Sequence, residues 1–371
     1  MEEKRNHMNI LVITNMWPDS KNAHLGSFVK ATVKQLEQYG CSVSYISLDR
    51  NYKNSLGKIF SYHIFWLKII RKLIIEQPKN VIVHFPVSAA PAIFFIVLLK
   101  KLGISSCNLI SNYHGNDLVP FDYESRLSMI TKRCFNNVVI SFCDKIVVPS
   151  NYFKKILLSE FEQSENKVVV DYSGGVDLDL FKPSSDNAAS GPTDQLRSRL
   201  KLLFVGRIVE KKGLFRALKS IVDAGLASQV ELTIIGDGPD KERVVTLLDN
   251  AELQYTCFGF IDRSELPKYY CAADFLLFPT LYLESLGLTP LEALACGTPV
   301  IARDRGAVSE YIQHGINGFH FDNDADLAYI IKEVIAMTTQ SKLEMRDACT
   351  KSVRLFSKNH SINVLTSIIK R

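Results

Sequence analysis

The sequence predicts an α/β protein built from two doubly wound, Rossmann-like domains, each around a parallel sheet. Three observations lead to this fold class. The chain has 371 residues, which suits two domains of roughly 150 residues each. Apolar residues make up 47% and charged residues 22%, so the chain can bury sizeable cores and is not intrinsically disordered. Short apolar runs alternate with longer periodic stretches, a pattern typical of βαβ units.

Six short apolar runs in the first half are expected to be buried parallel strands. The first run is followed by a helix at 27–39, which ends at Gly40, where a glycine commonly closes a helix. Longer periodic stretches separate the later runs. The expected strands cover 9–13, 42–48, 80–84, 108–113, 145–148 and 167–172.

The same alternation restarts after residue 200. Five further strands are expected, with helices between them that suit a second parallel sheet. The expected strands cover 201–205, 230–235, 254–258, 274–278 and 299–301, and the helices cover 212–225, 240–250, 264–272 and 287–296.

Residues 183–193 are small, polar and punctuated by proline and glycine, so they are the best linker candidate. We therefore expect an N-terminal, acceptor-side domain at 1–183, a linker at 184–195 and a C-terminal domain at 196–350. Residues 351–371 form a helical segment that could pack back on the first domain. Ligands of doubly wound sheets bind beyond the carboxyl ends of the strands. The chemistry is therefore expected in a cleft across which the two domains face each other.

Positive charge gathers in the first half of the chain. Residues 1–183 hold 22 lysines and arginines against 16 aspartates and glutamates (+6), whereas 184–371 hold 22 against 23 (−1). Nine bases and a single acid, Glu76, lie within 50–101. A local basic patch of this kind indicates an anionic surface or substrate. The net charge of +5 is too mild to predict nucleic acid as a partner.

Residues 58–75 of this basic region are expected to form a helix with two unlike sides. Such a helix can lie in an anionic membrane interface. The alternative is a helix packed on the sheet with a solvated basic face. On a helical projection Lys58, Lys68, Arg71 and Lys72 share one side, Ile59, Trp66, Ile70 and Leu73 share the other, and Ile64, Phe65 and Ile75 stray onto the charged side.

The eight cysteines form no C-x-x-C pair and mostly lie in apolar runs. Scattered buried thiols in a reducing compartment are the expected state. No signal-peptide pattern is visible, and no apolar stretch reaches the roughly 20 residues of a membrane span. We expect a cytoplasmic protein, with peripheral attachment to the cytoplasmic face of the membrane as an option.

A cationic loop follows the expected strand 201–205. Gly206 ends the strand, Arg207 and Lys212 follow, and a helix then begins. A helix N-terminus offers free N–H groups and a positive dipole, and two cations beside it suit a diphosphate. Each charge-assisted bond is worth about 1.5–3 kcal/mol. The alternative is a solvated basic turn; a Walker A loop is excluded because Gly-Lys-Ser/Thr is missing.

Two carboxylates flank the N-terminus of the expected helix 287–296. Glu284 lies in the loop before it and Glu292 in its first turn. Each can accept hydrogen bonds from sugar hydroxyls, while the N–H groups of Leu286, Gly287 and Leu288 can face a phosphate. The alternative for Glu292 is that it only complements the helix dipole.

The first half offers a histidine at the end of the expected strand 108–113. His114 is followed by Gly115 and by Asp117, which could orient it. A lone histidine is often structural, but its place at a strand end favours a functional role. The loop after the first strand closes with Gly26 and Ser27 and opens the next helix.

These motifs resemble the retaining glycosyltransferases of family 4 (glycosyl transferases group 1), which have the GT-B fold. The family's Glu-x7-Glu pattern is present as Glu284 and Glu292, and its Gly-Arg…Lys-Gly segment as residues 206–213. The resemblance covers nearly all of 200–320 and most of the first half. Further similar segments, in the family's order, lie at 174–183, 235–239, 258–260, 269–274, 306–310 and 315–318.

The resemblance implies a role for each motif of the second half. Arg207 and Lys212 would hold the donor diphosphate and stabilise charge on the departing nucleotide. Glu292 would accept the ribose hydroxyls, and Glu284 would contact hydroxyls of the transferred sugar. The backbone at Phe260 and Ile261 would border the base.

The resemblance also implies an acceptor side in the first half. His114 would reach hydroxyls of the donor sugar, and the loop with Gly26 and Ser27 would lie near phosphate and acceptor. This loop departs from the family, since Gly26-Ser27 replaces the usual Gly-Gly pair.

The implied activity is transfer of a sugar from a UDP- or GDP-linked donor to a saccharide acceptor, with retention and without a metal or other cofactor. The basic, aromatic region 50–101 suggests a lipid-diphosphate-linked acceptor, as in surface polysaccharide or O-antigen assembly. No Asp-x-Asp metal motif stands at an expected strand end of the first half; Asp177-Leu-Asp179 belongs to the segment that closes the first domain.

Two other functions stay open for a protein of this architecture. One is a nucleotide-sugar epimerase or hydrolase, and the other is a non-catalytic protein that binds a nucleotide-sugar. A Rossmann dehydrogenase is disfavoured, because no G-x-G-x-x-G follows an expected strand.

Overall fold

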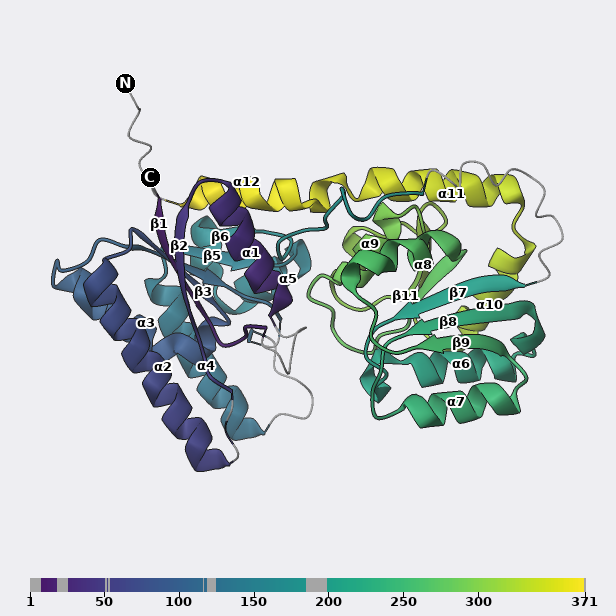
Figure 1. Ribbon diagram of the computed structural model, residues 1–371, viewed down its shortest axis with the longest axis horizontal. Coiled ribbons are helices and arrows are strands. Elements are labelled where there is room, and N and C mark those ends of the chain that lie inside the picture. The colour runs from purple at the N-terminus through teal and green to yellow at the C-terminus, as the bar shows by residue number, and fades with distance from the viewer. Residues whose placement is uncertain are drawn as a thin grey trace, which may run out of the picture. The chain divides into compact units, whose positions relative to one another are not determined.

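The chain folds into two compact units, each with its own parallel sheet (Figure 1). The first unit comprises Met1–Gly174 and Asn359–Arg371, and the second Gly175–Lys358. The predicted α/β fold class is thereby confirmed. The computed structural model describes residues 8–18, 26–50, 52, 54–115, 117–118, 125–184 and 199–369.

Two segments connect the units, and they differ from the expected domain limits. Residues 175–183, placed by the sequence in the first domain, belong to the second unit. There the Val176 N–H donates to the carbonyl oxygen of Phe356 (2.8 Å), and Lys358 pairs with Asp177 (3.2 Å). The last residues of the chain belong to the first unit instead. The expected linker 184–195, apart from Ser184, lies outside the described residues.

The first sheet has the strand order β2-β1-β3-β4-β5-β6, with all neighbours parallel. Its members are the six runs that the sequence predicts, with bounds that differ by one or two residues at some ends. Their bounds are β1 (Asn9–Thr14), β2 (Ser42–Ser47), β3 (Asn80–His84), β4 (Asn108–Asn112), β5 (Lys145–Val148) and β6 (Val168–Val170).

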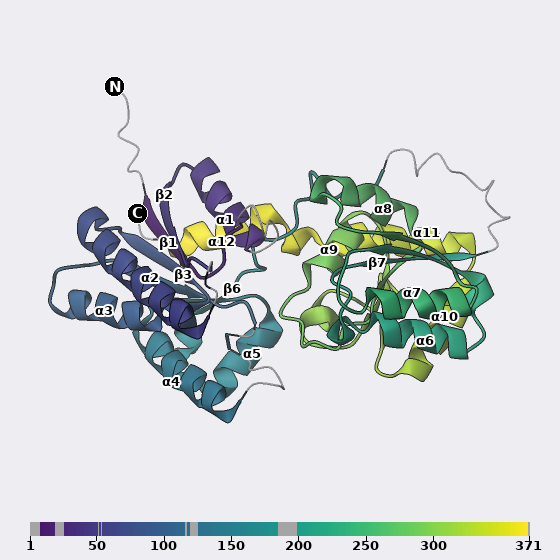
Figure 2. The same ribbon diagram turned by 60° about the horizontal axis from the view of Figure 1, so that its bottom comes forward.

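Helices cover both faces of the first sheet because alternate strand residues point to opposite sides. Leu11 and Ile13 of β1 belong to a core shared with α2 (Ser55–Glu76), α3 (Ala90–Lys101), α4 (Arg126–Phe142) and α5 (Asn151–Glu160). Ile10 and Val12 pack instead with α1 (Ser27–Gln38) and α12 (Lys358–Ile368) (Figure 2). The Asn108 side chain donates to the carbonyl oxygen of Ile368 at 2.8 Å, which fastens α12 to this face.

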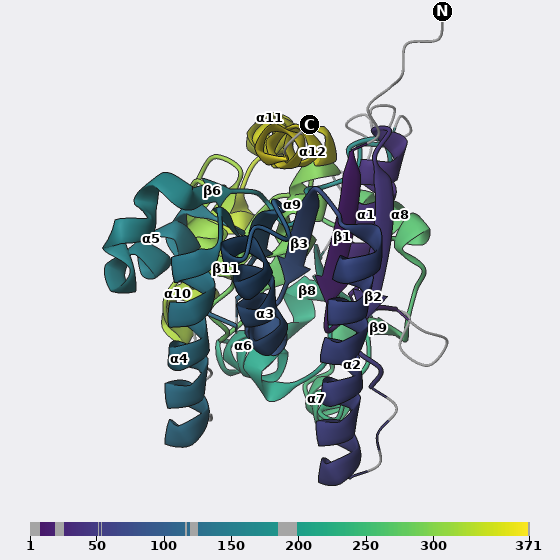
Figure 3. The same cartoon turned by 90° about the vertical axis from the view of Figure 1, so that its left-hand side faces the viewer.

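The buried stripe of α2 differs from the helical projection. Phe65, Ile69 and Leu73 are buried, whereas Ile59, on the uncharged side of the projection, is exposed. Phe65, on the charged side of the projection, thus belongs to the buried stripe. Residues 55–61 contain no buried side chain. The helix therefore packs through residues spaced four apart, beginning only after its first turns. The three helices α2, α3 and α4 line up side by side, with α3 in the middle (Figure 3).

The second sheet has the order β12-β11-β10-β7-β8-β9 and is also parallel. Five of its strands are predicted. The sixth, β12, was missed because it is short and begins with Gly318, whose Cβ position is blocked by the Val300 carbonyl. The bounds are β7 (Leu200–Val205), β8 (Val230–Ile235), β9 (Gln254–Phe258), β10 (Phe275–Phe278), β11 (Val300–Arg303) and β12 (Gly318–Phe321).

Two helix layers enclose the second sheet (Figures 1 and 2). One layer contains α6 (Leu214–Asp223), α7 (Lys241–Asn250) and α10 (Asp324–Ala336). The other contains α8 (Leu266–Ala272) and α9 (Leu288–Ala295), with α11 (Thr339–Ser352) packed on α9. None of the described helices combines the length and hydrophobicity that crossing a bilayer requires.

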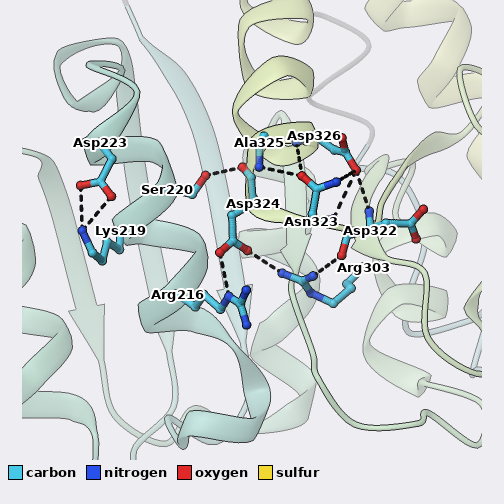
Figure 4. A network of polar contacts seen from close by, with 10 residues as sticks. All are labelled: Arg216, Lys219, Ser220, Asp223, Arg303, Asp322, Asn323, Asp324, Ala325 and Asp326. Atoms are coloured by element: carbon cyan, nitrogen blue, oxygen red, sulfur yellow. Dashed lines mark hydrogen bonds and ion pairs between the residues drawn. The ribbon is translucent and has the colours of Figure 1, made fainter.

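A buried arginine ties three elements of the second unit together (Figure 4). Arg303, at the end of β11, pairs with Asp324 at the start of α10 (2.9 Å), and Asp324 also pairs with Arg216 of α6 (2.7 Å). The Arg303 side chain is 5% exposed. Because a buried guanidinium is costly without an anion, Asp324 is the residue that makes this arrangement stable.

We predict that Asp324→Asn lowers the free energy of unfolding by about 2–3 kcal/mol, since Arg303 would stay buried without its counter-charge. Urea denaturation followed by far-UV circular dichroism measures this change. The matched control is Asp223→Asn, which breaks the exposed pair with Lys219 in the same region (Figure 4) and should change stability by less than about 0.5 kcal/mol. Equal effects of both exchanges would contradict the assignment.

Candidate functional site

Two loops at the carboxyl ends of β7 and β8 pack backbone against backbone. The N–H of Gly206 donates to the carbonyl oxygen of Ile235, and that of Ile208 donates to Asp237, both at 2.9 Å. A Cβ at Gly236 would overlap the carbonyl oxygen of Gly206, and its φ of +141° also favours glycine. This close approach fixes the loop that carries Arg207 at the carboxyl edge of the sheet.

Lys212 and Glu284 meet at this edge. The Nζ atom of Lys212 lies 2.7 Å from Oε1 of Glu284, and both side chains are largely buried. The ammonium also lies over the rings of Phe278 (5.5 Å) and Tyr282 (5.6 Å). The structure thus brings together a cation and a carboxylate that are 72 positions apart in the sequence.

Glycines make the contact between these segments possible. Gly213, directly after Lys212, has φ +73°, and a Cβ there would overlap the carbonyl oxygen of Pro279. On the other side of Glu284, a Cβ at Gly306 would overlap the carbonyl oxygen of Glu284, which accepts from the Ala307 N–H at 2.9 Å. The Lys212 and Glu284 loops are therefore held by backbone contacts that larger residues would break.

Glu292 is buried on α9, and its carboxylate accepts three hydrogen bonds. Its Oε1 accepts from Nε (3.0 Å) and Nη2 (2.6 Å) of Arg263, and its Oε2 accepts from the Tyr270 hydroxyl (3.2 Å). Burial raises the pKa of Glu292, while the charge and hydrogen bonds of Arg263 and the hydroxyl of Tyr270 oppose that rise. Sequence reasoning gave neither partner a role. Their place in the sequence, between the predicted base loop and the two glutamates, is the one signal that could have indicated them.

The N-terminus of α9 lies between the two glutamates in the sequence. Gly287 is its N-cap with φ +84° and no side-chain cap. Among the described residues, the structure provides no acceptor for the backbone N–H groups of Leu286, Gly287 and Leu288. The carbonyl side of this turn is fixed by the Tyr311 hydroxyl, which donates to Leu286 at 2.6 Å. The free donors and the helix dipole suit an anion.

The remaining predicted residues of this unit are more open. Arg207 is exposed, and no side chain of the described residues pairs with its guanidinium. Phe260 is 76% exposed and Ile261 is half-buried; both follow the carboxyl end of β9. The carboxyl edge of the second sheet therefore presents a paired cation, an exposed cation, free N–H groups and two carboxylates.

In the first unit, His114 contacts a second histidine that sequence reasoning missed. The Nε2 atom of His114 lies 2.8 Å from Nδ1 of His84, and their rings stack at 5.1 Å. His84 ends β3 and His114 follows β4, and these strands are neighbours. Parallel strands place such residues at one edge, so the pattern of strand ends could have revealed the pair. Phe28 and Phe85 also contact the His114 ring.

Both histidines are held neutral. Burial lowers the pKa of His84 to about 3. Burial, with the neighbouring His84, also lowers the pKa of His114 well below its usual value. One proton therefore lies between the two rings, and the hydrogen bond fixes the orientation of His114.

Asp117 acts on the backbone rather than on the His114 ring. Its carboxylate accepts from the N–H groups of His114 (3.1 Å) and Gly115 (2.9 Å). Burial raises the pKa of Asp117 to about 6, although these N–H donors favour the charged form. Asp117 was expected to orient His114. It does so by fixing the backbone turn at His114 and Gly115.

Steric contact explains why glycine stands at position 26 of the first loop. Gly26 caps α1 with φ +70°, and a Cβ there would overlap the carbonyl group of Met16. Ser27 begins α1. Residues 19–25 of this predicted loop lie outside the described residues. Within the described part of the chain, no three His, Cys, Asp or Glu side chains gather as metal ligands would.

Comparison with known proteins finds a family similarity in the second half of the chain. Residues 194–355 match the family described as Glycosyl transferases group 1. Lys212, Glu284 and Glu292 all lie within the matched residues.

Two bacterial proteins illustrate the similarity to curated relatives. An uncharacterized 41.2 kDa protein in the cps region of Klebsiella pneumoniae is 27% identical over 230 residues, which cover 60% of this chain and 61% of that protein. The lipopolysaccharide 1,2-N-acetylglucosaminetransferase of Salmonella typhimurium is 27% identical over 207 residues, covering 51% and 52%. The chain thus spans about half to three-fifths of these relatives' lengths.

Similarity to solved structures extends over both units. The Anabaena protein HepE, in complex with UDP, has a TM-score of 0.71 at 17% identity, with 97% of this chain and 99% of that chain covered. At this identity the similarity concerns the fold. The architecture predicted from the sequence, that of GT-B glycosyltransferases, is confirmed.

The histidine pair predicts a specific response to acid. Below pH about 6.5 the unfolded chain gains a proton at residue 84, which folded His84, with a pKa of about 3, does not bind. The unfolding free energy should therefore fall by up to about 1.4 kcal/mol per pH unit from this group. In His84→Gln that contribution is absent, so the variant should lose about 2 kcal/mol less than the wild type between pH 7 and pH 5.

Urea unfolding followed by tryptophan fluorescence reports on the first unit, which contains His84. Trp17 and Trp66 are the protein's two tryptophans, and both belong to the first unit. An equal loss of stability on acidification in both proteins would contradict the neutral, buried His84.

Proposed function

We propose that the chain is a retaining glycosyltransferase of family 4, which moves a sugar from a nucleotide-sugar to a saccharide acceptor. One observation carries the proposal: Lys212 and Glu284 meet at 2.7 Å within the residues that match group 1, at the carboxyl edge of the second sheet. That edge is where doubly wound sheets bind ligands. The match of this region to a transferase family makes a purely structural ion pair the weaker explanation.

The donor is proposed to bind through its pyrophosphate. The Lys212 ammonium has three donors, so it can hold Glu284 and a phosphate oxygen together. Arg207, exposed on the same loop, and the free N–H groups of Leu286, Gly287 and Leu288 add further donors. Glu292 accepts the ribose hydroxyls, Glu284 the sugar hydroxyls, and the backbone at Phe260–Ile261 borders the base. HepE binds UDP, which supports a UDP- or GDP-linked donor.

The reaction is proposed to proceed by front-face attack. The bond between the anomeric carbon and the diphosphate oxygen breaks, and the acceptor oxygen bonds to the same face of that carbon. The acceptor proton passes to the leaving phosphate oxygen. A covalent intermediate on a carboxylate is disfavoured because Glu284 is held by Lys212 and Thr280, and Glu292 by Arg263 and Tyr270. The main task is then to stabilise the departing diphosphate.

His114 and the first loop are proposed to serve the acceptor side. His114, fixed by His84, would hydrogen-bond hydroxyls of the transferred sugar. The backbone at Gly26 and Ser27 would lie near phosphate and acceptor, with Asp117 fixing the His114 turn. No metal is proposed, because Arg207 and Lys212 provide the positive charge that a metal ion would otherwise provide.

The acceptor is proposed to be a lipid-linked saccharide, met at an anionic membrane surface through region 50–101. The support is a group of exposed apolar side chains on α2, α3 and α4, interspersed with Lys58, Lys68 and Arg71, which are also exposed. Exposed apolar side chains together with exposed bases suit an anionic interface, which we propose to be the cytoplasmic face of the membrane. The apolar members are Leu56, Ile59, Phe60, Leu67, Ile74, Ile75, Phe94, Leu98, Leu127 and Ile130.

The alternative functions differ in their products. An epimerase or hydrolase would release an epimer or free sugar as its sole product. A non-catalytic binder would bind the nucleotide-sugar without turnover on any lipid-linked acceptor. The family match of residues 194–355 favours the transferase.

A thermal-shift screen of UDP-, GDP- and ADP-sugars tests the proposal, followed by turnover of the best donor with and without EDTA. Lys212→Ala and Arg207→Ala should each lower turnover by roughly 10²–10³, the usual effect of removing one transition-state charge donor. The control Lys219→Ala removes an exposed lysine of α6 that pairs with Asp223 and should leave turnover unchanged. Near-normal turnover in both variants, or a strict metal requirement, would contradict the mechanism.

The membrane proposal predicts weaker binding to phosphatidylglycerol-containing vesicles in two variants. Lys68→Gln with Arg71→Gln removes charge, and Phe60→Ser with Leu67→Ser removes apolar contact. Each pair should reduce binding about tenfold or more, and only the charge variant should lose its salt dependence. Lys241→Gln with Lys268→Gln, on the second unit, is the matched control. Unchanged co-sedimentation of both test variants would exclude this surface.

A further inference from the structure

We propose that Arg263 is a positioning residue that holds Glu292 ionised and ready to accept a ribose hydroxyl, and that it thereby makes the protein select ribonucleotides over 2′-deoxyribonucleotides. The inference rests on the proposed function, because it needs a nucleotide at the second sheet. It adds a residue that the sequence motifs do not contain.

The geometry of the pair is specific. Arg263 opens the short 3-10 turn Arg263–Glu265, directly after the loop with Phe260 and Ile261. Two of its nitrogens, Nε (3.0 Å) and Nη2 (2.6 Å), donate to the same oxygen, Oε1 of Glu292. The guanidinium therefore holds the carboxylate from one side, and the Tyr270 hydroxyl holds Oε2 from another.

Burial makes the arginine necessary for the charge of Glu292. The Glu292 side chain is 8% exposed, whereas the Arg263 side chain is 47% exposed. A carboxylate removed from water tends to take up a proton, and a protonated carboxyl becomes a donor on one oxygen. An ionised carboxylate is an acceptor only, with about four lone-pair positions. Three of these accept from Arg263 and Tyr270, and the fourth, on Oε2, stays available for a hydroxyl donor.

The surroundings of Glu292 leave Arg263 as its counter-charge. The titratable groups that face it are Arg263 from the turn after β9, Tyr270 from α8 and Cys296 at the end of α9. Tyr270 and Cys296 both have a raised pKa and so stay neutral near pH 7. Among these groups, the positive charge beside Glu292 therefore comes from Arg263 alone. The Arg263 guanidinium also lies 5.3 Å from the centre of the Phe181 ring.

The sign of the pH effect follows from this arrangement. Burial raises the pKa of Glu292, and Arg263 opposes the rise. Removing Arg263 must raise that pKa further, so protonation begins at a higher pH. Selection for the ribose hydroxyl then fades as the pH falls, and it returns as the pH rises. A merely structural brace would change affinity without this reversible dependence on pH.

The experiment measures UDP and 2′-deoxy-UDP binding by calorimetry from pH 6 to pH 9, with GDP and 2′-deoxy-GDP in parallel. The ratio of the two affinities removes the titration of the diphosphate, which both ligands share. Wild type should prefer the ribonucleotide by about tenfold or more. Arg263→Gln should reduce the preference to about threefold or less at the acidic end of the range and regain it towards pH 9.

Four further variants make the result decisive. Arg263→Lys keeps the charge and should retain most of the preference. Glu292→Gln should lose the preference at every pH, and adding Arg263→Gln to it should change nothing more, because both act through one carboxylate. Lys268→Gln, which removes an exposed pair with Glu265 in the same segment, should behave like wild type.

Two different failures can be told apart. If wild type binds no nucleoside diphosphate, the proposed function fails and this inference with it. If wild type binds UDP or GDP but Arg263→Gln keeps the wild-type preference at all pH values, the inference about Arg263 alone is overturned. The same holds if Glu292→Gln retains the preference.

Discussion

The ion pair between Lys212 and Glu284 is the interaction on which the functional site depends. It joins the loop after β7 to the loop after β10, two neighbouring strands of the second sheet. The two loops can approach because Gly213 and Gly306 stand where any side chain would overlap a backbone carbonyl. An ammonium held by a carboxylate and flanked by aromatic rings is placed before any ligand arrives. In the proposed reaction, the reorganisation needed to stabilise a departing diphosphate would be correspondingly small.

The same principle recurs where a polar group is buried at a strand end. Glu292 is held by Arg263 and Tyr270, and His114 by His84. In each case the residue that would touch a ligand is fixed by a second residue that would not. Such networks are costly if half satisfied, so their presence at the carboxyl edges of both sheets indicates sites rather than incidental packing. The structural cluster around Arg303 and Asp324 differs in that its members bind one another and brace helices.

The sequence predicted most of the fold, because buried parallel strands are short apolar runs separated by periodic helices. It missed β12, whose four residues begin with glycine, and it left open whether the apolar side of α2 faces the core or a membrane. Residues with a signature of their own, such as Glu284, Glu292 and Lys212, could be found from spacing. The partners Arg263 and Tyr270 could not, because they acquire their roles only through contacts between distant segments, whereas His84 could have been inferred from its place at a strand end. Burial and hydrogen bonding, rather than residue type, define these partners.

The most direct measurement of the central claim is the affinity of the protein for UDP compared with uridine, in the wild type and in Lys212→Ala. If the pyrophosphate is the group that the site holds, UDP should bind at least about 100-fold more tightly than uridine. In Lys212→Ala this ratio of affinities should be about tenfold smaller. Uridine affinity should not change. Equal binding of UDP and uridine, or a variant that weakens both alike, would contradict the account.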